Sequence, residues 1–118
     1  MSNRLLFAAM AVLVLAGCAS DPAPNEQMRL TEQALEQAKA VGATAEDVPE
    51  MKLAEDKFNR AKGSMAGESY KNARMRFEQA ELDARLAEAK VLTQKSEEQV
   101  NVLNTRIVRL RKQLGDAQ

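Results

Sequence analysis

Apolar residues recur every three or four positions along most of the chain, and no alternation typical of strands is present. The pattern predicts a first helix over residues 26–41, ended by Gly42. It predicts a second helix over residues 49–62, in which proline occupies the first turn. A third helix is predicted from Ser69 onward, because neither proline nor glycine interrupts residues 70–114 and strong helix formers dominate there.

The predicted helices differ greatly in length. At 1.5 Å per residue, ~45 residues of the third helix span ~68 Å, whereas ~14 residues of the second span ~21 Å. The first part of the third helix can therefore pack on the two shorter helices, while its last part outruns them. We expect an all-α fold, a helical hairpin or three-helix arrangement with a long C-terminal coiled-coil helix, divided into a helical domain at 26–90 and an extension at 91–118.

Small side chains dominate the part expected to pack, which should let helix backbones approach closely. The small residues are Ala54, Ala61, Ala73, Ala80, Ala84, Ala87 and Ala89, with Phe58, Tyr70 and Phe77 filling the gaps. Gly63 and Gly67 are expected to bracket the turn before the third helix.

From Leu82 onward the apolar period becomes 3.5, as in a coiled coil. Position a is then occupied by Leu86, Thr93, Val100, Ile107 and Leu114, and position d by Leu82, Ala89, Ser96, Leu103 and Leu110. Eight of these ten residues are apolar. The candidate partner-binding residues are those beyond the packed region: Val100, Leu103, Ile107, Leu110 and Leu114.

What covers this stripe stays open at the level of sequence. In a parallel homodimer Arg106 would face Arg111, and Arg85 would face Lys90, so like charges oppose self-association in that orientation. An acidic partner helix, an antiparallel arrangement, or the first helix folding over the stripe are the alternatives.

The N-terminal segment has the form of a secretory signal. An apolar run of eleven residues, Leu5–Leu15, follows a single positive charge and is too short to span a bilayer as a helix. The quartet Leu15-Ala16-Gly17-Cys18 resembles the bacterial lipobox, which implies removal of residues 1–17 and lipidation of Cys18. Two prolines within residues 18–25 then favour an extended tether. By the same resemblance, Ala19 after the cysteine favours the outer membrane.

Composition and charge narrow the function classes. The formal charge is zero, which gives no nucleic-acid signal, although residues 99–118 carry four basic and one acidic side chain, net +3. The chain has no His and one Cys, so no metal cluster, catalytic triad or catalytic residue is expected. No phosphate-binding glycine loop is present either. We therefore expect neither a cofactor nor an enzymatic activity.

The central segment resembles the domain of unknown function 4398 family of Gram-negative envelope proteins. The resemblance rests on Ala40-Val41-Gly42-Ala43, Val48-Pro49-Glu50-Met51, Ala54, Lys57-Phe58, Ala61, Tyr70, Ala73, Ala80, Leu82-Asp83-Ala84, Leu86-Ala87 and Ala89. It implies a helical periplasmic domain, often encoded beside or fused to OmpA-like peptidoglycan-binding domains, with no established activity.

Together these features predict a non-enzymatic, lipid-anchored outer-membrane protein that faces the periplasm and has a structural or adaptor role. Its expected partners are the membrane, through the lipid, and a protein or a second copy through the coiled coil. An OmpA-like protein or peptidoglycan is a further candidate. The alternatives are a chaperone-like module that binds clients through the stripe, and an Lpp-like spacer, which the absence of a terminal lysine disfavours.

Overall fold

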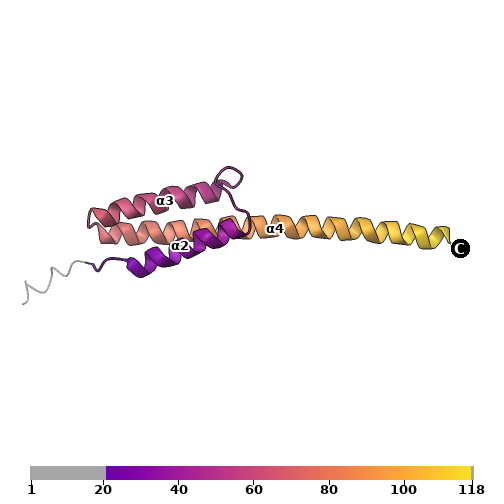
Figure 1. Ribbon diagram of the computed structural model, residues 1–118, viewed down its shortest axis with the longest axis horizontal. Helices are drawn as coiled ribbons and strands as arrows, with labels where there is room; N and C mark the ends of the chain where they lie inside the picture. The colour runs from indigo at the N-terminus through magenta and orange to yellow at the C-terminus, as the bar shows by residue number, and fades with distance from the viewer. Residues whose placement is uncertain (1–20, 118) are drawn as a thin grey trace, which may run out of the picture.

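The computed structural model describes residues 21–117, and this part of the chain forms three α-helices. Helix α2 covers Asn25–Ala40, α3 covers Pro49–Ala66, and α4 covers Tyr70–Asp116. α2 and α3 lie along the N-terminal half of α4, and the rest of α4 projects beyond them (Figure 1). With 47 residues, α4 is about 70 Å long. The predicted all-α fold with a long C-terminal helix is confirmed.

The core is built around one alanine-rich face of α4. α4 packs against both α3 and α2, while α2 and α3 touch each other little. The buried residues of α4 are Ala73, Phe77, Ala80, Ala84 and Ala87; those of α3 are Met51, Ala54, Phe58 and Ala61; those of α2 are Thr31, Ala34, Leu35 and Ala38. The rings of Phe58 and Phe77 fill the space between α3 and α4, with centroids 5.5 Å apart.

Thr31 ties α2 to α4 from within this core. Its hydroxyl lies 2.8 Å from the carbonyl oxygen of Gln27 and 3.0 Å from that of Phe77. The single hydroxyl hydrogen is therefore shared between α2 and α4. Because Thr31 is fully buried, these partners satisfy a polar group that would otherwise destabilise the core.

Two helix ends close with the same backbone motif but with different residues in the left-handed position. After α2, Gly42 has φ 96°, and the amide of Ala43 donates to Ala38 O at 2.9 Å. After α3, Glu68 has φ 57°, and the amide of Ser69 donates to Ser64 O at 2.9 Å. Both are Schellman motifs, for which glycine is the usual residue.

Two details of the prediction are wrong. α3 continues to Ala66 and passes through Gly63, so the positive φ of the following turn lies on Glu68 and not on a glycine. Ala89, expected in the packed region, is exposed. The packing of α3 against α4 thus extends α3 by one turn, and the contact face of α4 ends at Ala87.

Candidate association surface

The heptad stripe lies on the side of α4 that faces away from α2 and α3. Two steps along an α-helix rotate a side chain by about 200°. Leu82 and Leu86 therefore point away from Ala80 and Ala84, which are buried against the other helices. Accordingly Leu82 is 67% exposed and Leu86 is 47% exposed. The stripe thus begins behind the three-helix body, opposite the alanine face.

The five predicted partner-binding residues continue this stripe beyond the body. They are Val100, Leu103, Ile107, Leu110 and Leu114, and their exposed fractions range from 45% to 70%. Within residues 21–117, α2 does not fold over them, because every residue from 92 to 117 is exposed. The ten residues at positions a and d between 82 and 114, eight of them apolar, therefore form one uncovered row, here called the seam.

Polar contacts fix α2 and α3 to the opposite face of α4. Lys57 Nζ lies 2.6 Å from the Asp83 carboxylate, and Lys90 pairs with Glu50 at the start of α3. Gln27 Nε2 of α2 donates to the Glu81 carboxylate at 2.7 Å. Together with the alanine core, these contacts hold the two shorter helices in place and leave the seam free.

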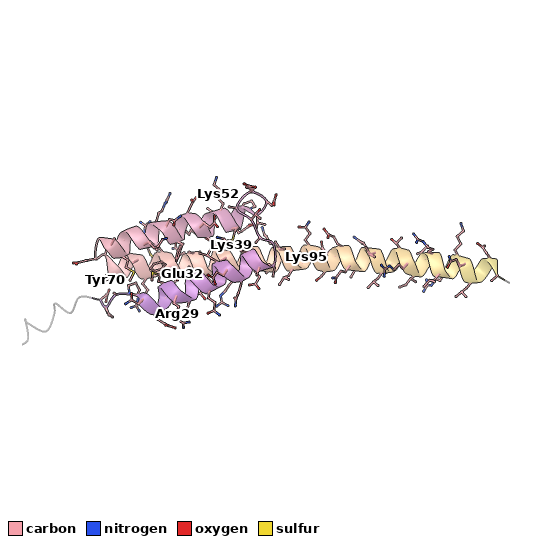
Figure 2. The ribbon with its side chains drawn as sticks, viewed as in Figure 1. Arg29, Glu32, Lys39, Lys52, Tyr70 and Lys95 are labelled. Atoms are coloured by element: carbon pink, nitrogen blue, oxygen red, sulfur yellow. The ribbon has the colours of Figure 1, made fainter. Side chains whose placement is uncertain are left out.

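Lys95 marks the end of the three-helix body. Its Nζ donates to Val41 O at 2.7 Å, at the C-terminal end of α2, where a cation is favourable. Figure 2 shows Lys95 at this junction, with the side chains beyond it extending from α4 away from any neighbouring helix. We call residues 96–116 the arm; they span about 30 Å.

The charges of α4 change sign between the body and the arm. Residues 81–98 contain five acidic and three basic side chains, net −2, whereas residues 99–118 are net +3.

The ion pair between α3 and α4 affects the ionisation of Glu50. The hydrogen bond from Lys90 lowers the pKa of Glu50, as does the hydrogen bond from its own backbone amide. Glu50 therefore stays ionised in the folded chain and keeps its pairing with Lys90.

The remaining surfaces of residues 21–117 offer little for binding a small molecule. The hollow between α2 and α3 is lined mainly by charged and polar side chains and is crossed by the ion pair of Lys39 with Glu55, at 2.9 Å. No group of three or more metal-ligating side chains gathers in this part of the chain. None of its helices is both long and apolar enough to cross a membrane. Cys18 lies outside the described residues.

Two features of this surface were missed at the level of sequence. Met75, which is 48% exposed on the same side of α4 as Leu82, carries the apolar row further behind the body. Its seven-residue distance from Leu82 was the signal. The sequence around Lys95 carried no such signal, because its hydrogen bond to Val41 O depends on where the C-terminal end of α2 lies against α4.

Comparison with known proteins agrees with this architecture. The family model described as "Domain of unknown function (DUF4398)" matches residues 26–103. A crystal structure of a DUF4398 family protein, PA2901 from Pseudomonas aeruginosa PAO1, is 67% identical to this chain with a TM-score of 0.79. That match covers 82% of this chain and all of the other. No curated protein matches significantly. Since the family model spans most of the three-helix body and the first part of the arm, the chain belongs to the DUF4398 family.

Proposed function

We propose that this protein is a non-enzymatic lipoprotein of the outer membrane that faces the periplasm and acts as an adaptor. Lipid on Cys18 holds one end, and the seam on the arm binds a protein partner. The observation that carries the proposal is that Asp21, the first described residue, and the arm lie at opposite ends of the described part of the chain. Asp21 lies beside Ser69 and Tyr70 at the turn between α3 and α4, far from the arm.

The position of the first described residues supports this arrangement. In Figure 2, Arg29 and Tyr70 lie at the same end of the body, and Lys95 lies at the other. A tether that leaves from the Tyr70 end therefore places the lipid there, and the arm extends about 30 Å beyond the other end of the body. Stable anchoring needs more than one acyl chain, which the lipobox resemblance supplies.

The seam supports a binding role for the arm. Single exposed apolar side chains are ordinary, but contiguous exposed rows mark interaction sites. The arm has five large apolar seam residues on one side, and no other helix of residues 21–117 covers them. An OmpA-like protein and peptidoglycan are candidate partners through the family resemblance.

Lipidation is tested by replacing Cys18 with Ser in the full chain. We expect the variant to lose incorporation of labelled palmitate and to leave the outer-membrane fraction on density-gradient separation. Val100→Cys, which leaves the lipobox intact, serves as a control for expression and export. Undiminished palmitate labelling of Cys18→Ser would show that the lipid is attached elsewhere or that labelling is non-specific.

Binding through the seam is tested by comparing Ile107→Glu with Lys112→Glu. Burying one large apolar side chain contributes about 1.5–3 kcal/mol, so a charge at position a should release the partner. Lys112 is off the seam, and its reversal should leave the apolar contact intact. Crosslinking in whole envelopes, followed by identification of the captured protein, reads out both variants. Capture of one dominant protein, lost only in Ile107→Glu, supports the adaptor role. Capture of many unfolded proteins supports the chaperone-like alternative.

A further inference from the structure

The seam is one continuous row from Leu82 to Leu114, and its two halves differ in character. The N-terminal half contains the small and polar members Ala89, Thr93 and Ser96, and the C-terminal half contains only large apolar residues. All ten seam residues are exposed. The row is 33 residues long, about 50 Å of helix, and its two ends are both leucines.

We propose that a second copy of this chain, running antiparallel, covers the seam, with Leu82 of each copy facing Leu114 of the other. This deepens the proposed function, on which it rests for the role of the seam, by naming the partner as the protein itself. Position a of one helix faces position d of the other in this arrangement. The layers that result are Leu82 with Leu114, Leu86 with Leu110, Ala89 with Ile107, Thr93 with Leu103, and Ser96 with Val100, each occurring twice.

Side-chain size favours this register. Each small or polar residue of one copy faces a large apolar residue of the other, so every layer of the seam contains at least one large apolar side chain. In a parallel pair at matched register, Ala89, Thr93 and Ser96 would each face themselves. Three consecutive layers would then lack a large apolar side chain in the middle of the coiled coil.

Charge favours the same orientation. The antiparallel register lays the arm of one copy, net +3 over residues 99–118, along residues 81–98 of the other, net −2. In coiled coils the residues that flank the seam set orientation. Here the antiparallel orientation removes the pairing of Arg106 with Arg111 that the parallel form would impose. Glu97 meets itself at the twofold axis, where two carboxylates repel.

The three-helix body leaves room for the second copy. α2 and α3 occupy the alanine face of α4, and the seam lies about 200° away from it. In the dimer the shorter helices of both copies therefore stay on the outside. The Tyr70 ends of the two copies come to lie roughly 84 Å apart along the rod, by the helical rise. The lipid anchors of the two copies would then lie at opposite ends of the dimer.

Single-cysteine variants distinguish the orientations. We would prepare the full chain in detergent with Leu82→Cys, with Leu114→Cys, and as a mixture of the two, and treat each with a short bifunctional maleimide. The antiparallel dimer predicts a crosslinked dimer in the mixture and not in either variant alone, because like positions are roughly 48 Å apart. A mixture of Leu82→Cys with Val108→Cys, which is off the seam, is the matched control and should not crosslink.

Mass spectrometry of the linked peptides identifies the joined positions, and analytical ultracentrifugation gives the mass. Ile107→Glu should weaken the dimer about 100-fold, equivalent to about 2.8 kcal/mol, while Lys112→Glu should change it little. Crosslinking of either single variant with itself would establish a parallel pair and overturn the proposal. A monomeric mass with no crosslink would also overturn it, whether the seam then binds anionic vesicles or another protein.

These outcomes are separate from those of the proposed function. The purified chain dimerises or fails to dimerise regardless of export. A crosslink through Cys18 in the wild-type chain would show a free thiol, which contradicts lipidation. The orientation of the seam is then decided from the linked peptides that join positions 82 and 114, and links through Cys18 are set aside. Conversely, a lipidated chain that remains monomeric contradicts only the antiparallel dimer.

Discussion

The turn between α3 and α4 places a left-handed backbone conformation on a residue with a side chain. Glu68 has φ 57°, and the amide of Glu68 donates to Met65 O at 3.0 Å in the motif that ends α3. In this conformation the Cβ atom of an L-residue crowds the following carbonyl oxygen, which costs roughly 1–2 kcal/mol. Glu68→Gly should therefore stabilise the chain.

The magnitude follows from two opposing effects. Removing the Cβ relieves the crowding, but glycine loses about 0.5–1 kcal/mol more backbone entropy on folding than other residues do. The net stabilisation is then about 0.5–1 kcal/mol. For a domain of this size, that shifts the melting temperature upward by roughly 2–8 °C.

Thermal denaturation followed by far-ultraviolet circular dichroism measures the shift. Glu68→Ala is the matched control, because it removes the carboxylate and keeps the Cβ. Gly67→Ala is the second control: Gly67 has φ −85°, and an added Cβ would meet Gly63 O at an ordinary 3.6 Å. The reasoning is refuted if Glu68→Ala raises the melting temperature as much as Glu68→Gly, since the side-chain charge would then be the cause.

Three further predictions follow from the body of the structure. Gly63→Ala should raise the free energy of unfolding, measured by urea denaturation, by about 0.5–1 kcal/mol, because Gly63 lies within α3 with open space around the added Cβ. An unchanged free energy of unfolding would contradict this. Thr31→Val should destabilise by about 1 kcal/mol through loss of the hydroxyl contact with Phe77 O, whereas Thr31→Ser should retain that contact. The pKa of Glu50 is lowered by Lys90 and by its own amide, so its stabilisation is present above the unfolded-state pKa and is lost as pH falls through the folded pKa. Glu50→Gln should reduce the loss of stability at acidic pH, measured by urea denaturation as a function of pH. An unchanged loss at acidic pH would refute the assignment.

The helices were predictable because their signals are local. The first predicted helix, 26–41, differs from α2 by one residue at each end, since apolar periodicity and Gly42 define it. The second was predicted too short, because glycine in a helix costs about 1 kcal/mol and Gly63 was read as a turn residue. Met65, which follows Gly63 in α3, packs against the core, and such a tertiary contact is not visible in local sequence.

The two faces of α4 were harder to separate from sequence. Alanine and leucine both favour helices and both count as apolar, so the pattern placed Ala89 in the packed set. In the structure the helices approach over the alanines, and the larger leucines two positions away face outward. Hydropathy ranks leucine as the better core residue; close helix approach selects alanine instead. The seam itself was predictable from its seven-residue repeat, and the same repeat, extended from Leu82 back to Met75, would have shown that the row continues behind the body.

The position of α2 bears on what can cover the seam. One alternative from sequence was that the first helix folds over it. Thr31 holds α2 to the backbone of α4 within the core, and Lys95 binds the end of α2 at Val41. Moving α2 to the seam would break both contacts and expose Ala34, Leu35 and Ala38, which are now buried. The cost would offset the gain from covering leucines on the other side. Cover for the seam therefore has to come from outside residues 21–117, and a second copy offers it without changing the packing of the first.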